Sequence, residues 1–444
     1  MRKFLDKVKH RLEDTAGHNG SQAAASVGPS AGSAANVGPI LDQRDWYMYR
    51  KQHGVNLGSW FVLERWIADS PFNNAAGPAQ SDLDVAKGQN AKVVLEHHWD
   101  TWVTDADWAW LADKGINTVR IPIGYYHICG ADPGVLKGTD FADLDHVFAG
   151  AWARLTNALA TAHRYGIGVL FDLHAAPGKQ NGDAHSGTSL EPAFFKHARN
   201  MDHALRVLSA LTTHLTAFAR SHDPPLPNLV GIELLNEPQP GGHDDELKRW
   251  YADAFRALRA IDPDLPLYIS DAWRTDDYAG FVKAWAQDIA TPAAEHARRL
   301  RDANDGTAKT FARVTGELEG AGGALVVGEW SAALNPGSLH GAPDERTAKR
   351  AFVEAQLALY EQYCAGWFFW TYKKEARGDT GWSFRDAVEA GNSRFLEEIG
   401  FLGPWAKRRA QAHVAQKGAS NVWEYEHGFK QGVRAASADL AAAG

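Results

Sequence analysis

Two glutamates of this sequence are spaced as a pair that could do acid–base chemistry. Glu237 directly follows the apolar run LVGIELLN, and Glu329 lies within ALVVGEW. A short apolar run rich in branched residues is typical of a strand buried in a parallel sheet. At roughly 31 residues per β/α unit, the two glutamates lie about three units apart, across the mouth of an eight-stranded barrel. Two such carboxyl groups predict glycoside hydrolysis, in which one protonates the leaving oxygen while the other stays ionised.

Polar residues also end most of the other predicted strands: Asn56, Arg120, His174, Asn236, Asp271, and Trp370 with Lys373. Because burying an unpaired charge is costly, so many polar groups at one end of a barrel favour a functional site. For Arg120 or Asp271 alone, a salt bridge that closes the ring is an equally good explanation. Arg120 could also hold one carboxylate ionised, and Asn236 could bond a sugar hydroxyl. Trp370 and Trp60 could each offer a flat face to a sugar ring, although core packing explains either one equally well.

The elements that would position these groups alternate between strand-like and helical patterns. The apolar runs lie at 53–58, 117–123, 166–174, 229–237, 265–273, 324–330 and 365–373, and amphipathic helical patterns cover 148–166 and 246–262. This alternation predicts an α/β fold, a (β/α)₈ TIM barrel. Seven strands are visible. Residues 274–323 hold no convincing apolar run, with FVKAW at 281–285 the best candidate, so the sixth strand is expected to be degraded or missing.

Composition narrows the class of protein. The 444 residues carry a formal net charge of −8, which argues against a basic nucleic-acid-binding surface. The two cysteines, Cys129 and Cys364, are too few for a disulfide framework and are predicted to be free thiols in a reducing compartment. The N-terminus lacks the apolar stretch of a secretory signal, and no run is long enough for a transmembrane helix. These features predict a cytoplasmic localisation.

Three segments are expected along the chain. Residues 1–14 have apolar side chains at helical spacing among basic ones, which indicates a possible amphipathic helix in weak contact with an anionic membrane. A short helix docked on the domain or exposed to solvent is the alternative. Residues 15–40 are rich in Ala, Gly and Ser and are predicted to be a flexible linker. Residues 41–444 are predicted to be a single catalytic barrel domain with a C-terminal extension.

No metal or other cofactor is predicted. The sequence has no HExxH motif, no paired CxxC motifs, no phosphate-binding Gly-rich loop of the P-loop type and no GxSxG motif. His97 and His98 are adjacent on a predicted helix, where neighbouring side chains do not converge on one ligand. His174, Asp183 and His185 share one loop, and no zinc motif supports them.

Six motifs together resemble a known family. GVNLGSWFVLERWI, TVRIPIGYY, DLHAAPGKQNG, GIELLNEP, VVGEWSAAL and GWFFWTYK resemble, in order, the motifs of family 5 glycoside hydrolases, most closely those of the fungal exo-β-1,3-glucanase branch. The resemblance implies a (β/α)₈ barrel and retaining β-glycoside hydrolysis without a metal, with Glu237 as the acid/base and Glu329 as the nucleophile. It further implies that Arg120, His174 and Asn236 surround the sugar, that Glu64 and Asn181 close the pocket around a terminal glucose, and that Trp370 is a stacking platform.

The chain departs from that family pattern in one motif. The family's sixth strand brings a His-x-Tyr motif beside the nucleophile, whereas the only histidine between Asp271 and Glu329 is His296, in the helix-like AAEHARRL. Three hypotheses remain. The favoured one is a retaining exo-β-1,3-glucanase or β-glucosidase that releases terminal β-linked glucose. The second is an intracellular β-glucosidase acting on a glucosylated lipid such as a steryl glucoside or glucosylceramide. The third is an inactive barrel that binds a glycan or a partner protein.

Overall fold

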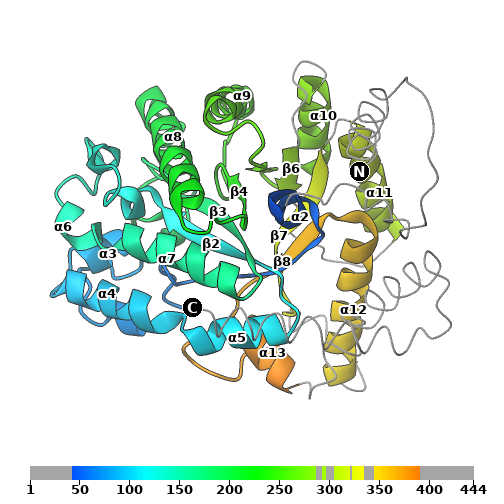
Figure 1. Ribbon diagram of the computed structural model, residues 1–444, viewed down its shortest axis with the longest axis horizontal. Helices are drawn as coiled ribbons and strands as arrows, with labels where there is room; N and C mark the ends of the chain where they lie inside the picture. Colours follow the sequence, from blue (N-terminus) through cyan, green and yellow to red (C-terminus); the bar gives the residue numbers. More distant parts are fainter. Residues whose placement is uncertain (1–42, 287–292, 297–304, 321–322, 335–344, 391–444) are drawn as a thin grey trace, which may run out of the picture.

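Eight parallel strands form a closed barrel in the order β1 to β8, surrounded by helices (Figure 1). The computed structural model describes residues 43–286, 293–296, 305–320, 323–334 and 345–390. The strands are β1 Gln52–Asn56, β2 Thr118–Gly124, β3 Gly168–Ala175, β4 Leu229–Glu233, β5 Leu267–Ser270, β6 Ala293–His296, β7 Ala324–Trp330 and β8 Gly366–Phe369. The helices are α2 Gln43–Tyr49, α3 Asp82–Ala86, α4 Ala91–Trp102, α5 Asp105–Asp113, α6 Asp145–Phe148, α7 Ala151–Arg164, α8 Ala198–Ser221, α9 Asp244–Ile261, α10 Thr275–Ala286, α11 Asp305–Gly320, α12 Glu345–Tyr363 and α13 Phe384–Ala390. The predicted TIM barrel is confirmed.

The sixth strand is present, which corrects the expectation that it is degraded or missing. β6 pairs in parallel with β5 at four positions and with β7 at three. It comprises 4 residues, as do β5 and β8. The candidate at 281–285 is wrong, because those residues lie within α10. The sequence AAEH contains no large apolar side chain, so its extended conformation depends on backbone pairing with its two neighbours rather than on local propensity.

The barrel helices follow from amphipathic spacing. In α7 the buried residues Ala151, Leu155, Ala158, Leu159 and Ala162 recur on one face, which packs on the strands. The chain leaves this helix through Gly166, whose φ of +71° is readily adopted only by glycine. α9 carries three acidic residues in its first turn, where the helix dipole favours negative charge.

The barrel interior has an apolar layer of side chains from five strands: Leu170, Val230, Tyr268, Val326 and Phe368. Tyr47 of α2 joins this cluster, and α2 contacts β4. Because side chains alternate along a strand, Leu170, Asp172 and His174 of β3 share one face. Leu170 belongs to the apolar layer, whereas Asp172 and His174 lie further along the same face. This face of β3 therefore becomes polar at the carboxyl end of the barrel.

Several sequence predictions concern segments outside the described residues. Residues 1–14 and 15–40 are among them, so the amphipathic helix and the linker stay predictions, as does the domain division.

Cys129 and Cys364 are both buried and unpaired, as expected. None of the helices within the described ranges is long and apolar enough to cross a membrane.

Candidate active site

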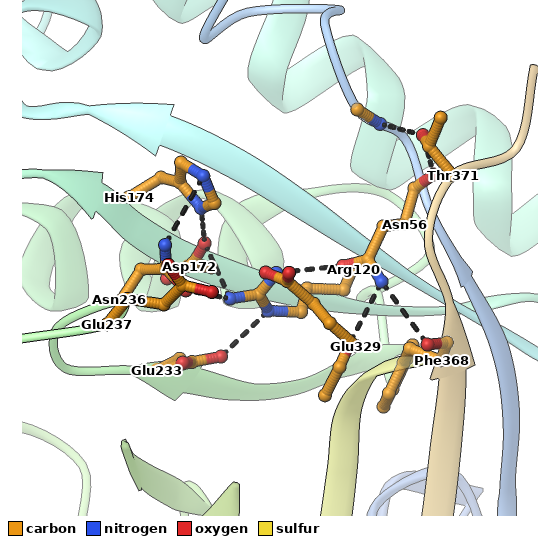
Figure 2. Close-up of polar contacts among 12 residues, drawn as sticks. Asn56, Arg120, Asp172, His174, Glu233, Asn236, Glu237, Glu329, Phe368 and Thr371 are labelled. Atoms are coloured by element: carbon orange, nitrogen blue, oxygen red, sulfur yellow. Dashed lines mark hydrogen bonds and ion pairs between the residues drawn. The ribbon is translucent and has the colours of Figure 1, made fainter. Parts of the chain in front are cut away.

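A buried arginine organises the carboxyl end of the barrel. Arg120 of β2 is fully buried, and its guanidinium contacts three carboxylates: Asp172 at 2.9 Å, Glu233 at 2.7 Å and Glu329 at 3.0 Å. It also donates to the amide oxygens of Asn56 at 2.8 Å and Asn236 at 3.0 Å. Figure 2 shows these side chains around the guanidinium. A planar fork with five donors suits this role, since each N–H points to a separate acceptor.

Strand register explains why this arginine is needed. Asp172 of β3 and Glu233 of β4 are direct neighbours across the sheet, and like charges placed opposite each other destabilise a sheet. The guanidinium lies against both and relieves this repulsion. Burial alone would lower the pKa of Arg120, but the charges of Asp172, Glu233 and Glu329 hold that pKa above its ordinary value. Arg120 is therefore permanently charged, and it favours the ionised form of Glu329.

A second chain of hydrogen bonds orients Asn236. His174 Nδ1 lies 2.6 Å from Asp172 Oδ2, so Nδ1 carries the proton when Asp172 is ionised. His174 Nε2 then accepts from the Asn236 side-chain amide at 3.3 Å. Since the Asn236 oxygen already accepts from Arg120, the amide can adopt only one orientation. Asn236 is thus held from both ends before any substrate enters.

Glu237 follows Asn236 in a left-handed backbone conformation, with φ of +45°. For a residue other than glycine this conformation costs on the order of 1–3 kcal/mol and is concentrated at functional sites. The loop after β3 holds it in place. Asn181 donates to the Glu237 carbonyl at 3.0 Å, and Gln180 donates to the Asn236 carbonyl at 3.0 Å. Asn181 therefore supports the backbone that presents Glu237.

His185 is a further group that faces Glu237. Its Nε2 lies 3.8 Å from Glu237 Oε2 and 3.8 Å from Asp183 Oδ2. Asp183, His185 and Glu237 are the group of potential metal ligands found in the described ranges, with ligand atoms within 4.8 Å of one another. The His185 ring also lies against His174, with 4.9 Å between the centroids. A histidine thus stands beside the predicted acid/base.

Two predicted sugar-contacting residues, Trp370 and Glu64, lie in the segments that follow β8 and β1. Trp370 is buried, and its ring is parallel to that of His174, with centroids 5.7 Å apart. Glu64 accepts from the indole N–H of Trp66 at 2.7 Å. Trp60 is instead part of the core, because its indole N–H donates to the Trp99 carbonyl at 2.8 Å and its ring packs on Phe61. For Trp60, core packing is therefore the explanation.

Three other polar candidates have local structural roles. Asp271 accepts from Trp273 N at 2.9 Å and Thr275 Oγ1 at 2.6 Å, so it holds the turn into α10. Lys373 pairs with Asp107 at 3.0 Å. His98 is buried against the Ser59 carbonyl at 2.6 Å, and burial lowers its pKa to about 4, so it is a neutral hydrogen-bonding group.

Sequence reasoning missed two residues of the site, Asp172 and Glu233. Both contact Arg120, and both are almost completely buried. A signal was present, since each is a carboxylate inside an apolar strand, where an unpaired charge would be very costly. Asp172 also precedes His174 by two residues and so shares its face.

The chain matches two family models. Residues 84–376 match the cellulase (glycosyl hydrolase family 5) model. This chain belongs to glycoside hydrolase family 5. Residues 356–439 match the glucan 1,3-beta-glucosidase 3 C-terminal domain. The family resemblance read from the six motifs is confirmed, and the protein is a glycoside hydrolase.

Curated relatives agree with this assignment, and a solved structure shares the fold. The family 5 chain is 33% identical over 375 residues to glucan 1,3-beta-glucosidase 3 of Schizosaccharomyces pombe, covering 79% of this chain and 75% of that protein. It is 32% identical over 383 residues to a probable glucan 1,3-beta-glucosidase A of Aspergillus fumigatus, covering 76% and 86%. Rutinosidase from Aspergillus niger superposes with a TM-score of 0.59 at 20% identity, covering 78% of this chain and 98% of that one. At that identity the superposition shows the fold alone.

Proposed function

We propose that this enzyme removes terminal β-linked glucose from a 1,3-β-glucan or a related β-glucoside, with retention of configuration. The observation that carries the proposal is the guanidinium of Arg120, which holds both Glu329 and the Asn236 side chain at 3.0 Å. Glu237 is the residue after Asn236. One charged group thus positions an ionised carboxylate next to the segment that presents a second carboxyl group. The relatives named glucan 1,3-beta-glucosidases support the substrate class.

The two carboxyl groups divide the chemistry. Glu329, kept ionised by Arg120, attacks the anomeric carbon as the bond to the leaving oxygen breaks, and Glu237 gives its proton to that oxygen. Water then gives a proton to Glu237 and attacks the glycosyl-enzyme, which releases glucose and frees Glu329. Asn236 donates its second amide N–H to the sugar 2-hydroxyl, a bond that strengthens in the transition state. His174 and Glu64 lie against the edges of the glucosyl ring, and Trp370 offers a stacking face to it.

The test of this mechanism is hydrolysis of an aryl β-glucoside. Glu329→Gln should lower kcat by at least about 10³-fold, since the amide cannot act as the nucleophile. Its free energy of unfolding should change by about 1 kcal/mol at most, because Arg120 keeps two of its carboxylate partners. Peptide mass mapping after incubation with 2-deoxy-2-fluoro-β-glucosyl fluoride should find the adduct on Glu329. An adduct on another residue, or an active Glu329→Gln enzyme, would refute the assignment.

The alternative function, hydrolysis of a glucosylated lipid, is tested by comparing substrates. Its motivation is a cytoplasmic localisation and the basic segment at 1–14, both of which remain proposals. The buried, unpaired state of Cys129 and Cys364 supports a reducing compartment. Laminari-oligosaccharides should be turned over faster than steryl glucoside or glucosylceramide, and the opposite ranking would favour the lipid function. Deleting residues 1–40 should lower binding to anionic vesicles if that segment contacts a membrane.

The inactive-barrel hypothesis is based on the absence of the sixth-strand His-x-Tyr motif. β6 is formed, and its last residue is His296. The tyrosine of the His-x-Tyr pattern is replaced in sequence, since Arg298 stands two residues after His296. Hydrolysis of the aryl β-glucoside therefore also decides whether that replacement is compatible with turnover.

A further inference from the structure

Two half-exposed tryptophans form an aromatic ledge beside the site. Trp66 is 45% exposed and Trp382 is 40% exposed, although tryptophan is normally well buried. Their ring centroids are 5.6 Å apart, and the rings meet edge to face. Trp66 follows β1 and Trp382 follows β8, and these two strands are paired neighbours in the barrel. Both residues therefore belong to loops at the carboxyl end, where Glu329 and Asn56 lie.

The ledge is connected to the pocket residues by direct contacts. The Trp66 indole donates to Glu64 at 2.7 Å. The carbonyl of Trp382 accepts from Thr371 N at 2.7 Å, and Thr371 is the residue after Trp370. The Trp370 ring in turn lies parallel to His174. The ledge therefore adjoins Glu64 and Trp370, the two residues that the proposed function places against the glucosyl ring.

The polar surroundings of the ledge favour a sugar as its occupant. Lys374 Nζ lies 4.7 Å from the centre of the Trp66 ring and pairs with Asp379 at 2.8 Å. Asp379 also accepts from Trp382 N at 3.1 Å. A pyranose has apolar C–H faces and a rim of hydroxyls, so it can lie on an aromatic face while its hydroxyls bond to charged neighbours. A sterol or acyl chain would have to desolvate the same charges without any hydrogen bond in return.

We propose that Trp66 and Trp382 form the subsite for the glucosyl unit on the leaving-group side of the cleaved bond. This inference rests on the proposed function and adds a substrate feature to it: the enzyme selects an oligosaccharide over a glucoside without a second sugar. The ledge contributes through binding of the leaving group and takes no part in the proton transfers.

The test compares two substrates that differ in the leaving group. β-Glucosyl fluoride has no sugar to occupy the ledge, whereas laminaritriose has two. Trp382→Ala should lower the ratio of kcat/KM for laminaritriose to that for β-glucosyl fluoride by about tenfold, mainly through a higher KM for the trisaccharide. Trp66→Phe should lower this ratio less, since an aromatic ring remains. Because phenylalanine has no N–H to donate to Glu64, this variant measures the loss of that hydrogen bond separately from the loss of stacking. Trp46→Ala removes a comparably exposed tryptophan on α2 and should leave the ratio unchanged.

A binding measurement tests the role of the ledge without depending on turnover. Titrating laminaritriose into Glu329→Gln and into Glu329→Gln/Trp382→Ala should give a Kd about tenfold higher for the double variant. An equal Kd in the two variants would overturn the ledge while leaving the hydrolase mechanism intact. A Trp382→Ala defect seen with steryl glucoside but not with laminaritriose would overturn the sugar as occupant. Failure of β-glucosyl fluoride hydrolysis in the unsubstituted enzyme would instead count against the proposed function.

Discussion

At the scale of single residues, the site depends on charge balance around Arg120. One guanidinium faces three carboxylates inside the barrel. In such a place the Coulomb attraction must offset a large desolvation cost, which it can do only if every donor has an acceptor. The five contacts of Arg120 meet that condition. The arrangement therefore couples the fold and the chemistry, because the residue that joins β2 to β3, β4 and β7 also keeps Glu329 ionised.

Replacing this arginine should damage stability and activity together. Arg120→Met would leave three buried carboxylates without their counter-charge and should destabilise the protein by about 3–5 kcal/mol. Arg120→Lys keeps the charge but loses the fork, so it should fold better and still lose activity. Urea unfolding and aryl glucoside hydrolysis measure the two effects. Arg65→Met is the control, since its exposed pair with Asp69 should contribute less than about 1 kcal/mol. An Arg120→Met protein as stable as the unsubstituted one would contradict this account.

At the scale of elements, the seam between β1 and β8 closes the barrel, and α12 secures it. Glu361 of α12 contacts Lys51 at 3.2 Å and His53 at 2.9 Å, both near the start of β1. It also accepts from the indole N–H of Trp367 on β8 at 3.0 Å. One carboxylate thus ties a helix to the first and last strands. Burial opposes its charge, but the hydrogen bond and charge of His53, with Trp367 and Lys51, lower the pKa of Glu361 to about 2.

This lowered pKa predicts a pH-dependent stability. The ordinary value is 4.5, so the stabilisation by Glu361 is complete above pH 4.5 and is lost as the pH falls towards 2. Glu361→Gln should therefore be less stable by about 1 kcal/mol at pH 5.5, a value reduced for solvent screening because the side chain is a third exposed. The difference should shrink as the pH is lowered towards 2. Urea unfolding at several pH values measures it, and a difference that does not change with pH would rule out the ion pairs as its source.

At the scale of the whole molecule, the barrel is filled in layers. The apolar layer of five strand residues lies below the polar layer around Arg120, and Tyr47 of α2 packs against the apolar one. α2 therefore acts as a plug at the end of the barrel away from the catalytic groups. In this arrangement the apolar layer stabilises the fold, and this offsets the desolvation free energy of the charges buried in the polar layer.

The plug can be tested with a matched pair on the same helix. Tyr47 is 3% exposed and Tyr49 is 45% exposed. Tyr47→Ala should lower the free energy of unfolding by about 3–5 kcal/mol because it leaves a cavity, whereas Tyr49→Ala should cost about 1 kcal/mol or less. The kcat/KM of the folded fraction should stay within about twofold in both, since neither residue belongs to the catalytic end. Equal losses of stability would show that α2 is not a plug.

The sequence by itself determined the fold class, the seven apolar strands and the family. Apolar runs and six ordered motifs are local patterns. They can be recognised in the sequence without knowing which strands lie next to one another in the fold. His174, Asn236 and Glu329 were found in this way because each stands near or just beyond the end of a strand, whereas Arg120 proved to lie inside β2.

Only the tertiary structure decided how these groups converge and what completes the barrel. β6 has no apolar signature, so its strand exists through pairing with β5 and β7. Asp172 and Glu233 become partners of Arg120 only because the register of β2, β3 and β4 places them around one guanidinium. The pairing of Trp66 with Trp382 likewise depends on the ring closing between β1 and β8. Register and closure join residues far apart in the chain, which no local pattern encodes.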